Sequence, residues 1–148
     1  GESYLPVLDA LHERNDIETV TCRHEGGAGF MAVADAKLTG RPGICFVTRG
    51  PGATNAATGI HTAKQDSTPL ILFVGQVARR TRDREAFQEI DYRAMFGTVA
   101  KWVTEIEAAD RIPEILQRAW TTATSCVRRF PGRPGPPTPR RPSWPTSW

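Results

Sequence analysis

Two uninterrupted apolar runs dominate the hydrophobic pattern of this chain. They are GICFVT at residues 43–48 and PLILFVG at residues 69–75, and neither alternates with polar residues. Such runs are typical of strands that are covered on both faces, as in a parallel sheet. Segments 26–40 and 52–66 are rich in small residues and predict helices, the first of which should end at Gly40.

Weaker patterns extend this alternation of helix and strand. Four further elements are predicted: a helix over 3–16 capped by Ser3, strands over 17–22 and 99–106, and a helix over 110–124 with Asp110 as its cap and Pro113 in its first turn. Some apolar residues share one helix face: Phe30, Met31, Ala34 and Leu38 in one helix, and Ile112, Ile115, Leu116 and Ala119, expected to point inward, in another.

Strands that alternate with helices predict an α/β fold, with a parallel sheet and helices on both faces. In such sheets, ligands bind beyond the carboxyl ends of the strands. Glu25, the turn at residues 50–52 and the loop after Gly75 each follow a predicted strand, so the sequence places them at one edge. The polar segment 78–89 has no clear period and predicts a long loop, which is often functional.

The composition changes after residue 125, which predicts one domain over residues 1–125 and a Pro/Arg-rich tail over 126–148. The tail holds seven of the 12 prolines and five of the 19 basic residues, but no acidic one. Prolines at this density predict a disordered or irregular tail. Residues 1–125 carry 14 basic and 16 acidic side chains, and they show no basic face with interleaved aromatic residues, so no nucleic-acid binding is expected.

Several classes of site are not represented in the sequence. No apolar run approaches the roughly 20 residues of a membrane helix, so no membrane association is expected. Cys22, Cys45 and Cys126 are odd in number and predict a reduced, cytoplasmic protein in which Cys22 and Cys45 are core residues. The glycine patterns of dinucleotide and P-loop sites and the nucleophile elbow do not occur, and no set of metal ligands emerges.

Each candidate at the predicted edge also has an ordinary structural interpretation. Glu25 could be an acid stabilised by the dipole at a helix start. The segment RGPGATN could be a tight turn in which Asn55 bonds the backbone, or a helix N-terminus that holds an anion. In the segment AFQE, Phe87 would pack, while Gln88 and Glu89 would be solvated.

The order of the segments distinguishes between these interpretations. Residues 1–125 contain, in this order, GESYLPVLDAL, RHEGGAGFMAVADAKLTG, TRGPGATNAATGIHTAKQDSTPLILFVGQV, AFQEID and AKWV. This series resembles the thiamine-diphosphate-dependent enzymes, and most of all the pyrimidine-binding, N-terminal domain of the acetolactate synthase-like group. The resemblance implies a flavodoxin-like sheet, and a first strand that precedes residues 1–3 and is missing from this sequence.

The chemistry of that family implies a role for each residue at the edge. The glutamate that matches Glu25 binds N1′ of the cofactor's aminopyrimidine, in dry surroundings that raise its pKa until it can share a proton. The cofactor's amino group then takes the proton from the thiazolium C2, and that ring serves as an electron sink. The resemblance places Pro51 and Asn55 beside the pyrimidine and Gln88 near the reaction centre. Lys101 matches a lysine near the substrate channel, although a solvated lysine is an equal interpretation.

The implied enzyme is a 2-oxo acid decarboxylase and carboligase that uses thiamine diphosphate. This chain would bind only the pyrimidine end of the cofactor, since Mg²⁺ and the diphosphate belong to a domain with a Gly-Asp-Gly…Asn motif that is missing here. The sequence leaves the use of FAD and the particular 2-oxo acid open. The cofactor of the family lies between two chains, which implies at least a homodimer, and the isolated chain is expected to be inactive or weak.

Three origins of such a chain stay open at this point. It can be a fragment or a frameshifted product, because GRPGP matches the family and the Pro/Arg-rich sequence after it does not. It can be a natural subunit whose partner chain carries the diphosphate-binding domain. It can also be a non-catalytic or vestigial α/β interaction domain.

Overall fold

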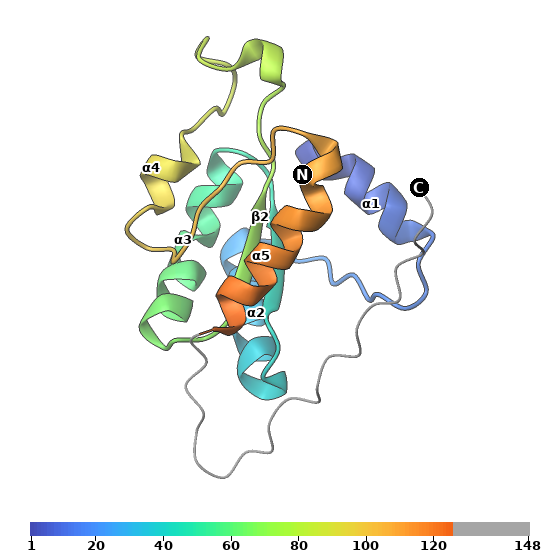
Figure 1. The fold of residues 1–148 in the computed structure, drawn as a ribbon, viewed down its shortest axis with the longest axis vertical. Coiled ribbons are helices and arrows are strands. Elements are labelled where there is room, and N and C mark those ends of the chain that lie inside the picture. Colours follow the sequence, from blue (N-terminus) through green and yellow to red (C-terminus); the bar gives the residue numbers. More distant parts are fainter. Residues whose placement is uncertain (126–148) are drawn as a thin grey trace.

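The fold was obtained as a computed structural model, which describes residues 1–125 (Figure 1). The predicted tail at 126–148 and Cys126 lie outside the described residues. Within residues 1–125, ten elements follow one another: η1 (Glu2–Tyr4), α1 (Leu5–His12), α2 (Glu25–Thr39), β1 (Gly43–Val47), α3 (Pro51–Gln65), β2 (Leu70–Val74), η2 (Arg79–Thr81), α4 (Tyr92–Phe96), η3 (Ala109–Arg111) and α5 (Ile112–Thr124).

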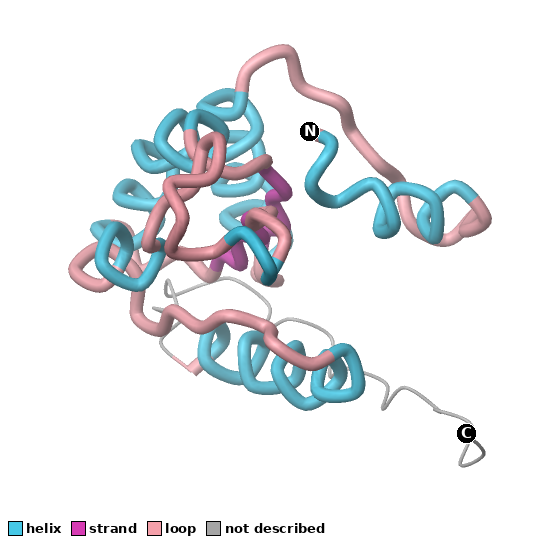
Figure 2. The backbone as a smooth tube through the Cα atoms, turned by 90° about the horizontal axis from the view of Figure 1, so that it is seen from above, coloured by secondary structure: helices cyan, strands magenta, loops and turns pink. Residues whose placement is uncertain are grey.

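The two apolar runs form a parallel pair of strands, as predicted. β1 and β2 are aligned from Gly43 opposite Leu70 to Val47 opposite Val74. Helices α2 and α3 cover one face of the pair, and α5 lies across the other face (Figure 2). The architecture is therefore the expected α/β arrangement with helices on both faces, built in the described residues on a two-stranded sheet.

The strands predicted over 17–22 and 99–106 are wrong. Neither segment joins the sheet within the described part of the chain. Segment 17–22 is solvent-exposed except for Cys22, with Ile17 and Val20 among the large exposed apolar residues. Segment 99–106 is separated from β2 by a cavity. A β-rich composition favours a strand only where a partner supplies the hydrogen-bonded ladder, and these segments have no such partner among residues 1–125.

Close contact between α2 and α3 explains why their sequences are rich in small residues. A Cβ atom added to Gly59 on α3 would lie 2.9 Å from the carbonyl carbon of Gly29 on α2. Ala32 on α2 and Ala53 and Ala56 on α3 are buried in the same core. Backbones that approach this closely leave no space for larger side chains, so the packing is sensitive to a single methyl group.

The apolar face predicted for α2 points outward. Its buried residues are Gly29, Ala32, Val33 and Ala36, whereas Phe30, Met31 and Leu38 are exposed, Leu38 to 78%. The small-residue face is buried because only that face permits the close contact with α3. The Sγ of Cys22 donates to the Sδ of Met31 over 3.5 Å, so Cys22 lies at this surface and is half-buried, whereas Cys45 is buried in the core as predicted.

The predicted helix ends are confirmed in part. Gly40 ends α2 in the left-handed conformation, with φ of 71°, and Pro113 lies in the first turn of α5. Ser3 does not cap the first helix; its hydroxyl bonds the Thr48 hydroxyl at 2.9 Å. Asp110 lies in η3, and α5 begins after Arg111 without a side-chain cap. None of the helices in the described region is long and apolar enough to cross a membrane.

Candidate functional site

The sheet edge predicted to carry the site is formed where β1 continues into α3. Gly50 connects them with φ of 55° and ψ of −108°, a conformation that residues other than glycine rarely adopt. Its N–H donates to the hydroxyl of Tyr92 at 2.8 Å, and Tyr92 is the first residue of α4. Pro51 begins α3, where its fixed φ suits the first turn and its missing N–H is not needed.

A carboxylate and an amide meet beside this turn. Glu25 is the first residue of α2, and the Nδ2 of Asn55 on α3 donates to its Oε2 at 3.1 Å. A Cβ atom at Gly52 would lie 3.6 Å from Glu25 Oε1 and 2.9 Å from Cγ2 of Thr48. The glycine therefore permits the turn to pack closely against Thr48 and the Glu25 carboxylate. The structure brings Glu25, Asn55 and the turn together, as the sequence predicted.

The pKa of Glu25 lies below its ordinary value of 4.5. The largest cause is the hydrogen bond from Asn55, the bond from its own backbone N–H adds to it, and partial burial acts in the opposite direction. The expectation of dry surroundings that raise this pKa is therefore wrong for the chain by itself. Glu25 is only half-buried here, so its side chain is a charged carboxylate at neutral pH. Asn55 orients this carboxylate, which can accept a hydrogen bond from a ligand.

The loop that carries Gln88 reaches the same turn. A Cβ atom at Gly50 would lie 2.8 Å from both the Cβ and the carbonyl oxygen of Gln88, so the two residues are in contact. Gln88 has a positive φ of 65°, which is uncommon for a residue other than glycine. Pro51, Asn55, Glu25 and Gln88 thus lie around one turn.

Residues that the sequence analysis did not single out hold this loop. The Nε of Arg49 donates to the carbonyl of Phe87 at 3.3 Å, and its guanidinium pairs with Glu2. Glu89 accepts the N–H groups of Asp83 at 2.7 Å and Ala86 at 3.0 Å, so it orders the loop and is not simply solvated. Phe87 does not pack, since it is 78% exposed.

Sequence signals for these residues were weak. Arg49 directly precedes the predicted turn, and an arginine there could have been recognised as an anchor for a neighbouring loop. Tyr92 lies 42 positions from its partner Gly50, and no local pattern connects residues at that separation.

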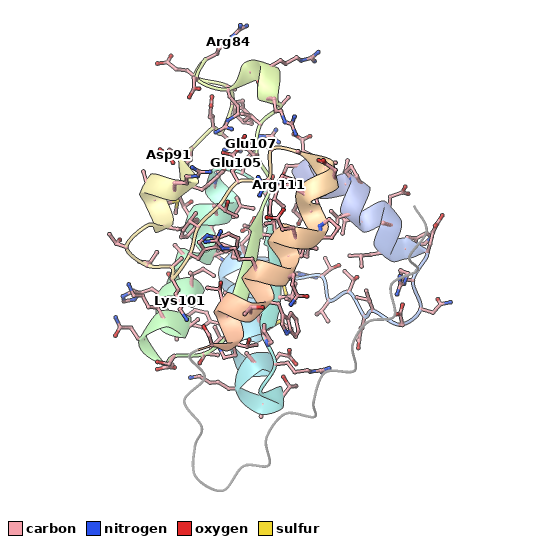
Figure 3. All side chains as sticks on the ribbon, viewed as in Figure 1. Arg84, Asp91, Lys101, Glu105, Glu107 and Arg111 are labelled. Carbon is pink, nitrogen blue, oxygen red and sulfur yellow. The ribbon has the colours of Figure 1, made fainter. Side chains whose placement is uncertain are left out.

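Lys101 lies at the other end of the sheet. Its Nζ donates to the carbonyl of Thr122 at 3.2 Å and to the hydroxyl of Ser125 at 2.6 Å. Figure 3 shows Lys101 beside the last turn of α5, far from Glu105 and Glu107. A lysine there satisfies the terminal carbonyls of the helix and complements its dipole, so the structure supports its structural interpretation.

We expect the Asn55→Ala substitution to raise the pKa of Glu25 toward its ordinary value, because the amide is the largest cause of the lowering. The stabilisation by this bond is present above pH 4.5 and is lost as the pH falls through the lowered pKa. Carboxyl-carbon NMR titration measures the midpoint directly. The Asn15→Ala substitution in the exposed loop is the matched control, and an unchanged midpoint in Asn55→Ala would contradict the assignment.

We expect the Arg49→Met substitution to loosen the loop that carries Gln88. It removes the bond to Phe87 and the ion pair with Glu2, and the loss of one such bond should speed amide exchange over 86–89 by about 2- to 10-fold. Hydrogen–deuterium exchange read by mass spectrometry would measure the change. The Arg79→Met substitution on η2 is the control; equal exchange in both variants would show that Arg49 is not the anchor.

The fold and the site define a class of protein: an α/β domain that presents a carboxylate, held by an amide, at the carboxyl edge of a parallel sheet. The family described as "Thiamine pyrophosphate enzyme, N-terminal TPP binding domain" matches residues 1–95. The chain belongs to this family.

Curated relatives agree with this assignment. The chain is 43% identical over 136 residues to the acetolactate synthase isozyme 3 large subunit of Escherichia coli (strain K12), which covers 92% of this chain and 23% of the relative. It is 40% identical over the same share of the chain to the acetolactate synthase large subunit of Lactococcus lactis, and 38% identical to the mitochondrial acetolactate synthase catalytic subunit of Saccharomyces cerevisiae. The chain spans about a fifth of the length of these relatives.

Proposed function

We propose that this chain supplies the aminopyrimidine half of a thiamine diphosphate site, with Glu25 as the residue that binds the ring nitrogen N1′. The observation that carries the proposal is the contact between Glu25 and Asn55 beside Gly52. The parent activity is decarboxylation of a 2-oxo acid followed by carboligation, as in enzymes resembling acetolactate synthase. The names of the curated relatives support this choice.

The residues present fit the pyrimidine end of the cofactor. Asn55 holds the Glu25 carboxylate through Oε2, and the carboxylate is only half-buried. The ring would reach this half-exposed carboxylate from the solvent side, with Pro51 and Gln88 on the neighbouring turn and loop. The diphosphate and Mg²⁺ need other ligands: the described residues contain no cluster of three or more His, Cys, Asp or Glu side chains placed to hold a metal.

Glu25 would hold a proton at N1′ of the ring. When bound, thiamine diphosphate supplies a thiazolium ring that accepts the electron pair released by decarboxylation. The carboxylate by itself is charged at neutral pH, since its ordinary pKa is 4.5 and Asn55 lowers the pKa further. A ring and a second chain that cover Glu25 would remove water from it and raise its pKa, which makes proton sharing with a weakly basic nitrogen feasible. Asn55 keeps the carboxylate oriented during this change.

The complete site requires a second polypeptide surface. We infer at least a homodimer, or a partner chain that carries the diphosphate-binding half, because the site edge of this chain reaches only one end of the cofactor. The free thiols of Cys22 and Cys45 are consistent with a reducing compartment such as the cytoplasm. A non-catalytic interaction domain is the rival function.

The test compares the binding of the whole cofactor with the binding of its parts. Thiamine diphosphate, thiamine and the free aminopyrimidine are titrated into the full chain while the NMR signals of Glu25 and Asn55 are followed. All three should shift both signals, since they share the ring, and Glu25→Gln should weaken the effect. No shift with any of them at millimolar concentration rejects the site. Adding a separately expressed diphosphate domain then separates a catalytic module, which recovers decarboxylation of pyruvate, from a vestigial domain, which does not.

A further inference from the structure

The turn at residues 50–52 is held from outside the sheet. β1 ends at Val47, whose carbonyl accepts the N–H of Gly75 at 3.0 Å, so the N–H of Gly50 lies beyond the ladder of the two strands. Gly50 is buried, and among the described residues its N–H finds its acceptor in the hydroxyl of Tyr92, at 2.8 Å. A buried N–H that loses its acceptor costs more than the hydrogen bond itself contributes. The conformation of the turn therefore depends on this one hydroxyl.

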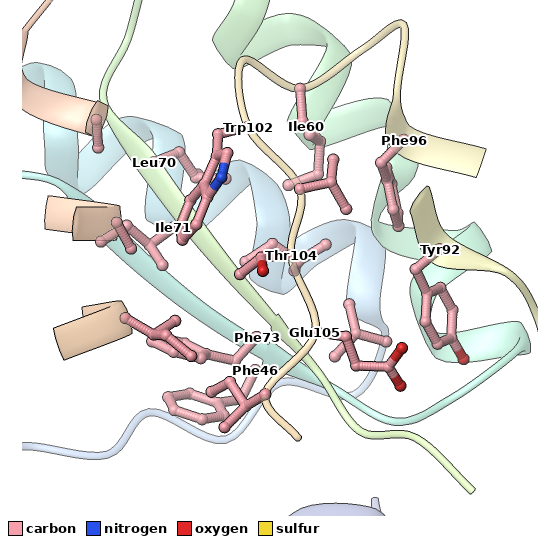
Figure 4. Close-up of a pocket in the computed structure, with 18 of the residues that line it drawn as sticks. Phe46, Ile60, Leu70, Ile71, Phe73, Tyr92, Phe96, Trp102, Thr104 and Glu105 are labelled. Carbon is pink, nitrogen blue, oxygen red and sulfur yellow. The ribbon is translucent and has the colours of Figure 1, made fainter. Parts of the chain in front are cut away.

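Helix α4 places the hydroxyl because its two aromatic residues lie on one face. Tyr92 and Phe96 are one helical turn apart, and Figure 4 shows both rings among the residues that line the cavity beside β2. Phe96 is buried in the core, and Tyr92 packs against the same core cluster. Asp91 caps the helix, since its Oδ1 accepts the N–H of Ala94 at 3.0 Å. The ring of Tyr92 is therefore fixed by packing, while its polar tip reaches the turn.

The hydroxyl of Tyr92 is a neutral acceptor near pH 7. Burial is the largest influence on its pKa and raises it above the ordinary value of 10.0. The hydrogen bond from Gly50 and the charge of Arg49 lower this pKa, and the charge of Glu105 raises it. A neutral phenol accepts a hydrogen bond while it keeps its own hydrogen, so the contact with Gly50 does not change over the neutral pH range.

The conformation of Gly50 determines how α3 begins. Its φ of 55° and ψ of −108° are rarely adopted by other residues, and its carbonyl accepts the N–H of Thr54 at 3.0 Å, in the first turn of α3. Pro51 begins this turn, and Asn55, at its end, donates to Glu25 at 3.1 Å. A change in φ or ψ that moves the N–H of Gly50 away from its acceptor also changes the direction of α3 relative to β1. The bond between Asn55 and Glu25 depends on that direction.

The loop before α4 contacts the same turn from a second side. A Cβ atom at Gly50 would lie 2.8 Å from the carbonyl oxygen of Gln88, and the Nε of Arg49 donates to the carbonyl of Phe87 at 3.3 Å. Both contacts use backbone atoms of the loop. The bond to Gly50 from α4 uses a side-chain atom of Tyr92, so a substitution can remove it without altering the backbone of the loop.

We propose that Tyr92 is a positioning residue of the site: its hydroxyl holds Gly50 in the conformation that directs Pro51 and Asn55 toward a bound ring. Tyr92 acts through Gly50 and needs no contact with the ring. The identity of that ring as an aminopyrimidine rests on the proposed function, whereas the connection from Tyr92 through Gly50 to Asn55 is a property of this chain by itself.

The test follows single groups of the full chain by NMR. The Tyr92→Phe substitution removes one oxygen atom and should speed exchange of the Gly50 amide proton, relative to the amides of β1, by about 2- to 10-fold. The pKa of Glu25 should move toward its ordinary value of 4.5 as its bond with Asn55 loosens. Thiamine, which contains the aminopyrimidine ring, should bind about 2- to 10-fold more weakly than to the parent chain.

Two control variants separate positioning from stability. Phe96→Leu removes buried ring atoms from the same face of α4 and leaves the phenol of Tyr92 in place. It should lower the unfolding temperature at least as much as Tyr92→Phe, yet leave the exchange of Gly50, the pKa of Glu25 and the binding of thiamine as in the parent chain. Tyr4→Phe removes a phenol oxygen that has no hydrogen bond to the turn in the described residues, and it should leave the same three measurements unchanged.

Three results contradict the proposal. Tyr92→Phe can leave the exchange of Gly50 and the pKa of Glu25 unchanged, Phe96→Leu can change them equally, or the Gly50 amide can be unprotected in the parent chain, which needs no variant. If the parent chain does not bind thiamine, the proposed function fails. The exchange of Gly50 and the pKa of Glu25 then still decide whether Tyr92 positions the turn.

Discussion

The Glu25→Gln substitution is expected to lower decarboxylation by about 10²- to 10⁴-fold in a mixture of this chain with a diphosphate-binding domain. Glutamine has nearly the shape of glutamate, and its carbonyl can still accept the hydrogen bond that Asn55 donates. What the substitution removes is the charge that holds a proton at the ring nitrogen. Release of carbon dioxide from pyruvate measures the effect.

The control for this prediction is Glu18→Gln, which removes a carboxylate from the exposed loop before α2. It should leave the recovered activity unchanged, and both variants should unfold at nearly the temperature of the parent chain. If the Glu25→Gln variant keeps a third or more of the activity, Glu25 has no essential role in the reaction. This result would leave the fold and the family assignment intact, because these rest on other observations.

The Gly59→Ala substitution is expected to destabilise the domain by about 1–3 kcal/mol. Alanine normally stabilises a helix relative to glycine by about 1 kcal/mol, so the predicted sign is the reverse of the helix propensity. The reason is the contact with α2: the new methyl group would lie 2.9 Å from the carbonyl carbon and 3.0 Å from the Cα of Gly29. Both are backbone atoms that cannot rotate away, so α2 and α3 must move apart.

Gly27→Ala is the matched control, because this helical glycine has no atom within 4 Å of an added Cβ. It should be neutral or stabilising by up to about 1 kcal/mol. Urea denaturation of both variants gives the two free energies of unfolding. If Gly59→Ala is as stable as Gly27→Ala, then α2 and α3 do not pack as closely as described, and the position of Glu25 relative to Asn55 must be revised.

Movement between these helices also affects the site. Glu25 begins α2 and Asn55 lies in the second turn of α3, so their 3.1 Å bond depends on how the helices cross. A Gly59→Ala chain should therefore show a Glu25 pKa that is closer to the ordinary value, as in Asn55→Ala. The core and the site are connected through one helix pair.

The sequence by itself determined the elements with strong local patterns. The apolar runs over 43–48 and 69–75 identified both strands of the sheet, and Gly40 marked the end of α2. It also placed the turn at residues 50–52 at the carboxyl edge of the sheet, because that turn follows a parallel strand. Glu25 lies beside the turn although no strand precedes it among the described residues, because α2 packs against α3 and Asn55 binds its carboxylate. The strands, the end of α2 and the turn depend on backbone periodicity and on the special conformations of glycine and proline, which are local properties.

Only the tertiary structure decided which face of α2 is buried, which β-rich segments pair, and in which direction the pKa of Glu25 shifts. Phe30 and Leu38 looked like core residues by hydrophobicity, yet close helix packing buries Ala32 and Ala36 in their place. Segment 17–22 has a strand-like composition but no partner strand in the part of the chain that the structure describes. The amide of Asn55, 30 positions away, sets the pKa of Glu25. Each outcome depends on groups distant in the chain, since burial, pairing and electrostatics are properties of neighbours in space.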